Sequence, residues 1–323
     1  MLLVCEVGVD TCGGGFRDNR VFTFCMLPKI PKMIKKTSHS EFHDIRTVRH
    51  HVRLWGDASA PKLFLLHGWM DVSASFQFLV EAFKKDWCVV APDWRGFGQS
   101  AWAKEGYWFQ DYYADLDALL EIYSPNEPAR IVGHSMGGNI ACVYTGIRPQ
   151  RVAKLASLEG FGMGRARADM APERYERWLN ELRGEAQSFR PYASFDAVAE
   201  RLMKNNKRLP RDKADFLARH WARQQADGKI ELCFDPRHKI VNPVLSRLEE
   251  LIECWKRVTC PTLWVVTNEI DPRGWRKDTP EQMAERKNAF RDFREVTLAD
   301  SGHMMHHDQP QKLAAILEDF LTT

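Results

Sequence analysis

Ser135 lies in a pattern that can turn an alcohol into a nucleophile. Residues 131–138 read Ile-Val-Gly-His-Ser-Met-Gly-Gly, so Ser135 stands between Gly133 and Gly137, after a short apolar stretch and before a sequence of helical character. A serine on a sharp strand-to-helix turn needs small residues two positions before and after it, because strand and helix are pressed together there. The pattern therefore predicts a nucleophile elbow with the Ser135 hydroxyl pointing outward.

A serine hydroxyl becomes reactive only beside a histidine base that is itself held by a carboxylate. His303 follows the apolar stretch 294–298 in the sequence Ser-Gly-His-Met-Met. For the acid we favour Asp271, because in this chain order of serine, acid and histidine the acid follows a late strand, and Asp271 follows the late apolar stretch 262–267. Glu159, after the stretch 155–158, is the rival carboxylate. The expected catalytic triad is Ser135, Asp271 and His303.

Acyl transfer also needs two backbone N–H donors at the developing oxyanion. Met136, directly after the nucleophile, supplies one donor, and we assign the second to Trp69 in the loop His67-Gly68-Trp69. His67, Gly68 and His134 flank these donors and are expected at the substrate pocket, where shape and hydrogen bonding explain them better than catalysis. The Trp69 ring is expected to line an apolar pocket.

A metal site is not expected. His303 and His306 have the His-x-x-His spacing that some metal sites use. The sequence shows no third ligand near this pair and no helical context around it.

The composition is that of an ordinary globular protein. The chain has 323 residues, of which 44% are hydrophobic and 28% charged, and its formal net charge is +3. This charge is too small to recruit nucleic acid or an anionic membrane, and no run of about 18 apolar residues offers a membrane span. The eight cysteines form no Cys-x-x-Cys pair. We expect a cytoplasmic monomer or homodimer that acts on a small molecule, without nucleic-acid or membrane partners.

Strand and helix patterns alternate along most of the chain, which predicts a parallel sheet with helices on both faces. Expected strands cover residues 42–49, 51–55, 63–66, 88–91, 131–132, 155–158, 262–267 and 294–298. Expected helices cover residues 75–84, 111–122 and 137–146 and a C-terminal segment with Leu313, Ile316, Leu317 and Phe320 on one face.

Three regions differ in composition. Residues 1–37, with three consecutive glycines and no amphipathic period, are expected to be a disordered extension, and an over-extended start codon is one hypothesis for them. Residues 161–255 are rich in arginine and glutamate, punctuated by proline and nearly free of strand signals, so they predict an all-helical cap. Residues 38–160 and 256–323 then form the α/β core.

Four blocks resemble the α/β-hydrolase superfamily, from about Glu41 to the C-terminus. These are residues 67–69 (His-Gly-Trp), 93–100 (Asp-Trp-Arg-Gly-Phe-Gly-Gln-Ser), 133–138 (Gly-His-Ser-Met-Gly-Gly) and 302–303 (Gly-His) followed by Gln309-Pro310. Residues 67–76 are further similar to the serine hydrolase-like group of lidded hydrolases. The resemblance implies a mostly parallel eight-stranded sheet, a helical cap inserted after strand six, and no cofactor.

The resemblance also narrows the chemistry. A serine nucleophile argues against the haloalkane dehalogenase and epoxide hydrolase branches, which use an aspartyl ester. We expect a serine hydrolase that cleaves a carboxylic ester, or a similar acyl bond, of a small or medium apolar substrate through an acyl-serine. The alternatives are a carbon–carbon bond hydrolase or perhydrolase with the same triad, and a non-catalytic member that only binds a ligand.

Overall fold

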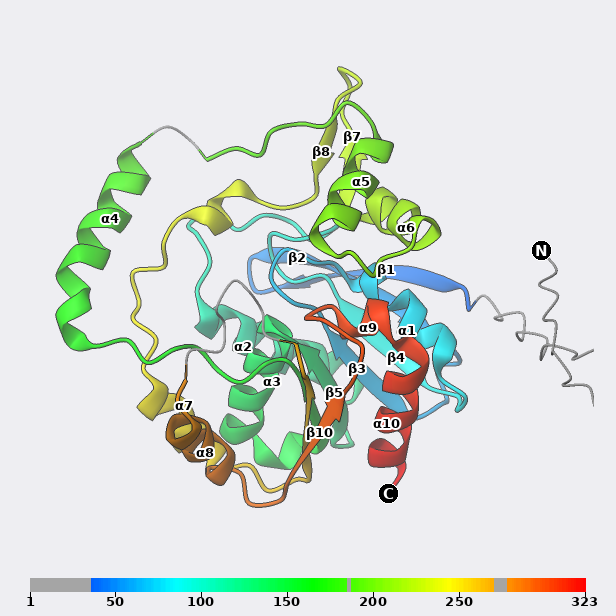
Figure 1. Cartoon of the computed structure of the whole chain (residues 1–323), viewed down its shortest axis with the longest axis vertical. Coiled ribbons are helices and arrows are strands. Elements are labelled where there is room, and N and C mark those ends of the chain that lie inside the picture. Colours follow the sequence, from blue (N-terminus) through cyan, green and yellow to red (C-terminus); the bar gives the residue numbers. More distant parts are fainter. Residues whose placement is uncertain (1–35, 185–186, 270–277) are drawn as a thin grey trace, which may run out of the picture. The chain divides into compact units, whose positions relative to one another are not determined.

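The computed structural model describes residues 36–184, 187–269 and 278–323 (Figure 1). Asp271 lies outside these residues, as does nearly all of the N-terminal extension expected over residues 1–37. The expectations about both therefore stay predictions.

An eight-stranded sheet in the order β1-β2-β4-β3-β5-β6-β9-β10 forms the centre of the fold. The pairs β1–β2 and β2–β4 are antiparallel, and the five remaining pairs are parallel. The strands are β1 (Ser38–Ile45), β2 (Val48–Trp55), β3 (Lys62–Leu66), β4 (Cys88–Pro92), β5 (Ala129–His134), β6 (Val152–Leu158), β9 (Thr262–Thr267) and β10 (Phe293–Leu298). The expected α/β fold class with a mostly parallel eight-stranded sheet is confirmed, and the segment expected to form the cap follows the sixth strand, β6.

Helices cover both faces of this sheet because successive strand side chains point to opposite sides. On β3, Leu63 and Leu65 pack with α1 (Gln77–Ala82) and α10 (Pro310–Thr322), while Phe64 and Leu66 join the core on the other face. That second core includes side chains from α2 (Phe109–Tyr123), α3 (Met136–Ile147), α7 (Leu248–Trp255) and α8 (Pro280–Asn288). The continuous apolar strands read from the sequence are thus strands buried on both faces.

The first hairpin differs from the sequence-based bounds by a few residues. The turn between β1 and β2 contains Arg46, whose φ of 57° lies in the left-handed region, and the buried Ile45 and Val48 flank the turn. The alternating pattern of a hairpin does not mark its turn when no glycine or proline stands there, so the sequence placed this turn three to four residues late.

The segment between β6 and β9 contains more than helices. It holds α4 (Ala171–Arg183), α5 (Phe195–Asn205), α6 (Arg211–Trp221) and a two-stranded antiparallel pair, β7 (Ala222–Gln224) with β8 (Ile230–Leu232). The loop of this hairpin contains Gly228 at φ 84°. The dipeptide Asp227-Gly228 is typical of a hairpin turn, but strands of three residues each are too short to show an alternating pattern in the sequence. In Figure 1, α5, α6, β7 and β8 gather together while α4 lies apart from them.

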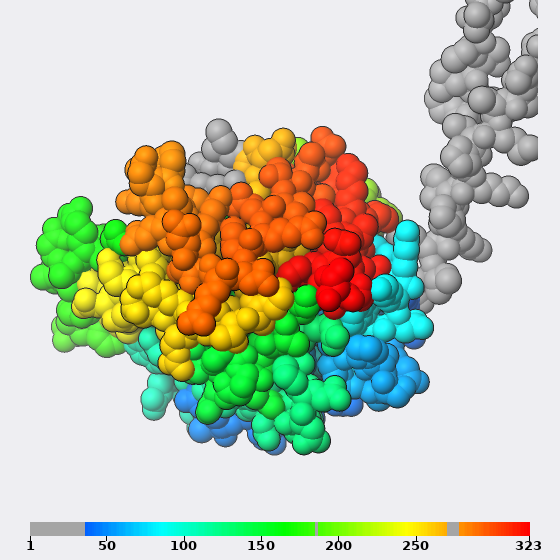
Figure 2. Space-filling model, turned by 90° about the horizontal axis from the view of Figure 1, so that it is seen from below, coloured from blue at the N-terminus to red at the C-terminus, as the bar shows by residue number. Residues whose placement is uncertain are grey.

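The last part of the chain returns to the sheet. Between β10 and α10 lies the short helix α9 (Met305–Asp308), which follows the loop containing His303. Figure 2 shows these segments, orange to red, together on the face seen from below, next to the yellow segment that precedes β9. Within the described residues, no helix combines the length and the apolar character needed to span a bilayer.

Candidate active site

Ser135 sits on the elbow that the sequence predicts. It joins the end of β5 to the start of α3 with φ 51° and ψ −112°, a strained conformation for a residue with a side chain. Its N–H donates to the carbonyl of Leu158 at 2.8 Å, which ties the turn to the neighbouring strand β6. Although Ser135 occupies the N-cap of α3, its side chain makes no capping hydrogen bond. The hydroxyl is therefore not used by the helix.

The positions of the glycines around Ser135 have no room for a larger side chain. A Cβ on Gly133 would collide with the backbone of Gly137, and a Cβ on Gly137 would collide with the carbonyl of Leu66 on β3. A Cβ on Gly138 would meet the Ser157 hydroxyl. Strand, helix and the end of β3 thus meet in backbone contact at the elbow, as the sequence pattern predicts.

His303 lies beside the nucleophile's own strand. The Nε2 of His134, the residue before Ser135, donates a hydrogen bond to the His303 carbonyl at 2.8 Å, and the two rings lie 4.8 Å apart. The loop after β10 and the end of β5 are thereby joined at the carboxyl edge of the sheet. This is the arrangement expected for a base and a nucleophile carried by different strands.

Glu159 is the carboxylate that the described residues place next to His303. Its Oε2 lies 3.8 Å from His303 Nδ1, and its side chain is only 7% exposed. Its Oε1 accepts the backbone N–H of Thr267 at 2.8 Å, and its φ of 56° marks a second strained turn at a strand end. Asp271, which the sequence favours, lies outside the described residues.

The two residues expected to donate to the oxyanion belong to segments that adjoin Ser135. Met136 is the first residue of α3, so its N–H belongs to the first turn of the helix, which has no intrahelical acceptor and carries the positive end of the helix dipole. The loop with Trp69 approaches from the other side, because a Cβ on Gly68 would lie 3.2 Å from the Ser135 Cβ.

His67 and His134 are buried and hold the framework in place. The His67 Nε2 accepts the N–H of Trp94 at 2.9 Å, so its Nδ1 carries the proton and donates to the Gly68 carbonyl at 2.8 Å. Burial lowers the pKa of His67 and, together with the neighbouring His306 and His303, lowers the pKa of His134 well below its usual value. Both imidazoles are therefore neutral at pH 7.

A cavity of about 530 Å³ opens at Ser135. Trp69 and Met136 line it from the core, as expected, whereas His67, Gly68 and His134 are buried and are not part of its wall. These three residues were expected at the substrate pocket, and they lie behind it instead because the loop after β3 packs directly on the elbow.

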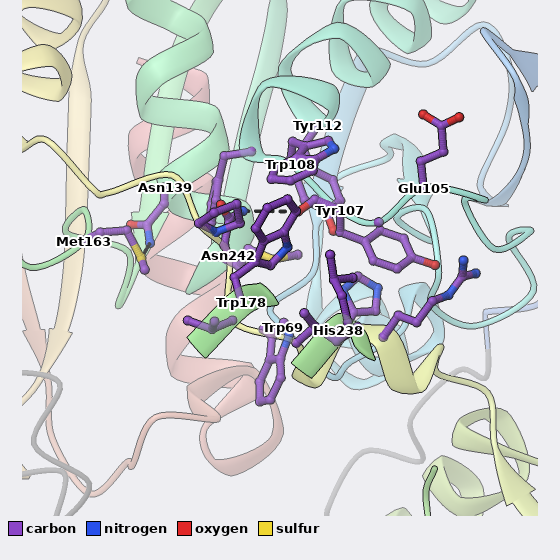
Figure 3. Close-up of a pocket in the computed structure, with 18 of the residues that line it drawn as sticks. Trp69, Glu105, Tyr107, Trp108, Tyr112, Asn139, Met163, Trp178, His238 and Asn242 are labelled. Carbon is purple, nitrogen blue, oxygen red and sulfur yellow. Dashed lines mark hydrogen bonds between the residues drawn. The ribbon is translucent and has the colours of Figure 1, made fainter. Parts of the chain in front are cut away.

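Residues that the sequence did not single out form most of the cavity wall. Figure 3 shows Trp178, which comes from α4, with its ring toward Trp108, and Tyr107 and Trp69 also belong to this wall. Further lining residues are Phe109, Tyr112, Met163, Leu182, Val241 and Pro243. The aromatic cluster at residues 102–109 was the available signal, although aromatic residues at such positions are more often explained by packing.

Two polar groups of the cavity wall, Arg237 and the Tyr107 hydroxyl, share one carboxylate, that of Asp235. Arg237 donates to the carboxylate of Asp235 at 2.6 Å, and the Tyr107 hydroxyl donates to the same carboxylate at 2.6 Å. His238 stacks on Tyr107 with ring centroids 3.6 Å apart, and burial lowers the pKa of His238 to about 3. With the arginine neutralised and the imidazole uncharged, the inner wall favours an apolar ligand.

The chain is similar to known proteins in both sequence and structure. The profile of the alpha/beta hydrolase fold family matches residues 61–310. The chain is 24% identical to a serine hydrolase-like protein of Danio rerio over 287 residues, which covers 83% of this chain and 84% of that protein.

Two solved structures share the fold. The thioesterase domain from the curacin biosynthetic pathway superposes with a TM-score of 0.77 at 21% identity, covering 89% of this chain and all of that domain. An esterase from Mycobacterium tuberculosis superposes with a TM-score of 0.66 at 21% identity, covering 89% of this chain and 92% of that one. With the family profile spanning most of the sequence and the elbow in place, the chain belongs to the α/β-hydrolase family.

Proposed function

We propose that the protein is a serine hydrolase that cleaves a carboxylic ester, or a similar acyl bond, of a small or medium apolar substrate. The observation that carries this proposal is the strained Ser135 elbow at the mouth of the cavity, with its hydroxyl left free by the helix it caps. The family and the esterase and thioesterase among its structural neighbours support a hydrolase.

The proposed reaction runs through an acyl-serine. The Ser135 Oγ forms a bond to the substrate carbonyl carbon while His303 takes the hydroxyl proton. The bond to the leaving alcohol then breaks, and His303 gives the proton to the departing oxygen. Water then attacks the acyl carbon while His303 takes one of its protons. The bond from this carbon to the Ser135 Oγ breaks as His303 returns the proton to Oγ, which releases the acid and free Ser135. The N–H groups of Met136 and Trp69 stabilise the negative oxygen in each tetrahedral intermediate.

We assign the carboxylate of the triad to Glu159, with Asp271 as the alternative. The support for Glu159 is its 3.8 Å distance to the Nδ1 of His303 together with its burial. A carboxylate there holds the imidazole in the tautomer that presents Nε2 to the serine and stabilises the imidazolium that forms.

The cavity supports an apolar acyl or alcohol group as the part of the substrate that is recognised. Its volume lies in the range of pockets that enclose small or medium organic molecules, and tryptophan, tyrosine and methionine side chains make up much of its wall. Because Arg237 is paired with Asp235, a carboxylate or phosphate on the substrate would find no free cation at that position.

The test is a substrate panel on the purified full chain. It contains p-nitrophenyl esters of increasing acyl length, a thioester, a lactone and a cleavable dione, each assayed with wild type and Ser135→Ala. The proposal expects hydrolysis of the esters that disappears in Ser135→Ala. Cleavage of the dione alone would favour the carbon–carbon hydrolase alternative, and ligand binding without turnover would favour the non-catalytic one.

A further inference from the structure

Three buried side chains with unsatisfied polar atoms meet behind His303. Asp71, His134 and His306 are 2%, 1% and 0% exposed, respectively. Each has one polar atom without a hydrogen-bond partner, namely Asp71 Oδ2, His134 Nδ1 and His306 Nδ1. Buried polar atoms are almost always hydrogen-bonded, so unsatisfied ones in neighbouring side chains require an explanation. Asp71 Oδ2 and His134 Nδ1 are candidate ligand atoms, whereas the other ring nitrogen of His306, Nε2, is the one that lies near Asp71 Oδ2.

The three residues come from distant segments that converge at the carboxyl edge of the sheet. Asp71 follows β3, His134 ends β5, and His306 lies in α9. One donor atom from each lies within 4.8 Å of the other two, and His306 Nε2 is 3.6 Å from Asp71 Oδ2. Over residues 36–184, 187–269 and 278–323, no other group of three histidine, cysteine or acidic side chains is assembled in this way.

The donor atoms suit a divalent transition metal ion. Imidazole nitrogen and carboxylate oxygen are ligands of Zn²⁺. The Asp71 Oδ1 accepts the N–H of Val72 at 2.9 Å, which fixes the carboxylate and leaves Oδ2 as its available oxygen.

The hydrogen bond of His134 has the form found at metal sites. Because Nε2 donates to the carbonyl of His303 at 2.8 Å, the lone pair of His134 is on Nδ1. Histidine ligands in metalloproteins regularly donate their second ring nitrogen to a backbone carbonyl in this manner, which fixes the tautomer and the ring orientation. Here the carbonyl belongs to the histidine that the proposed reaction uses as its base.

The required movement is small. Two ligand atoms about 2.0 Å from a tetrahedral zinc ion lie roughly 3.3 Å apart. The ligand atom of His306 would be Nε2, which lies 3.6 Å from Asp71 Oδ2 and would exchange its contact with the Ser75 hydroxyl for the ion. The rings of His134 and His306 have centroids 4.6 Å apart. The three ligand atoms lie within 4.8 Å of one another, so the most distant pair would have to approach by at most roughly 1.5 Å.

We propose that Asp71, His134 and His306 form a binding site for a divalent transition metal ion, with Zn²⁺ as the best match. His306, the second histidine of the His-x-x-His sequence at 303–306, is one ligand of this site. Asp71 and His134 come from distant parts of the sequence, so the spacing does not reveal them. A bound ion would also fix the His303 carbonyl through His134. This effect on hydrolysis rests on the proposed function, whereas metal binding itself does not.

A buried water could satisfy the same three atoms, and a binding experiment separates the two explanations. Metal-free full-length protein is dialysed overnight against Co²⁺, and the bound metal per chain and the visible absorption spectrum are measured. We expect one tightly bound Co²⁺ per chain, displaced by Zn²⁺, with the ligand-field bands of nitrogen and oxygen ligands and no sulfur-to-metal charge-transfer band. The absence of that band excludes the cysteines as ligands.

Variants then locate the bound ion. Asp71→Asn and His306→Gln keep the side-chain size and should each weaken binding at least about tenfold, because each removes a ligand or its charge. The matched control is His39→Gln, which removes a histidine from an exposed histidine–carboxylate pair on β1 and should leave binding unchanged. Circular dichroism verifies that each variant is folded.

Two results would overturn the proposal. One is wild-type protein that binds no stoichiometric Co²⁺ or shows the sulfur charge-transfer band, and this result is decisive even if both variants unfold. The other is equal binding by wild type, Asp71→Asn and His306→Gln. Neither readout uses hydrolysis, so failure of the metal site and failure of the proposed enzyme activity remain distinguishable.

Discussion

The Oε2 atom of Glu159 lies 3.8 Å from the Nδ1 atom of His303. Glu159 follows β6 and His303 follows β10, and these two strands are separated in the sheet by β9 alone. A buried carboxylate at this position can orient the imidazole toward Ser135. Substitutions of Glu159 and Asp271 can therefore identify the acid of the triad.

Replacing Glu159 with glutamine should abolish most of the activity. Glu159→Gln keeps an oxygen for the Thr267 N–H but removes the charge beside His303, so kcat should fall on the order of 10³- to 10⁴-fold. Asp271→Asn should leave kcat within about threefold of wild type. Both are measured with the best ester of the panel. The reverse pattern would move the acid role to Asp271 while leaving the serine mechanism intact.

Trp178 should contribute to binding rather than to chemistry. It lines the cavity from α4, so Trp178→Ala should raise KM for an apolar ester by about tenfold, the effect of losing roughly 1.4 kcal/mol of burial, with little change in kcat. Steady-state kinetics provide the measurement. Tyr175→Ala is the control, because this residue is on the same helix, is 48% exposed and does not line the cavity. Equal effects of the two variants would contradict this role for Trp178.

The elbow should not tolerate a methyl group at Gly137. The Cβ of Gly137→Ala would collide with the Leu66 carbonyl, so the free energy of unfolding should fall by about 1 to 3 kcal/mol. Gly164→Ala is the matched control, because its added Cβ meets no atom within 4 Å. Urea unfolding followed by tryptophan fluorescence compares the two. Similar stabilities of the two variants would argue against close backbone contact at the elbow.

His238 should make the protein sensitive to acid. Its pKa is about 3 in the folded protein and about 6.5 in an unfolded chain, so the unfolded state binds more protons between these values. Stability should therefore fall as the pH drops from about 6.5 toward 3. The variant His238→Phe, which can still stack on Tyr107, should show a shallower fall in unfolding free energy between pH 6.5 and pH 4.

The control for this experiment is His39→Gln on the exposed face of β1, which should retain the wild-type pH dependence. If His238→Phe also follows the wild-type curve, the imidazole does not titrate differently in the folded and unfolded states.

The elbow and the sheet could be predicted from the sequence because both rest on local rules. Glycines around Ser135 and alternation of apolar strands with helices are short-range patterns, and β9 was predicted with the bounds it has. The strained φ of Glu159 and its distance to His303 depend on how separate strand ends converge, which residue spacing does not encode.

The cavity wall was harder to predict for the same reason. Trp178, His238 and Val241 come from the segment between β6 and β9, and their approach to Trp69 follows from packing between distant segments. The cluster of Asp71, His134 and His306 likewise joins a loop, a strand end and a short helix that only the folded sheet brings together.

The reactivity of Ser135 is the most direct test of the account. The native protein is treated with a fluorophosphonate, digested and analysed by mass spectrometry, with Ser135→Ala and heat-unfolded protein as controls. We predict one phosphonyl adduct per chain, on Ser135, that is absent from both controls. A native protein that stays unlabelled, or that carries the adduct on a different residue, would contradict the proposed serine hydrolase.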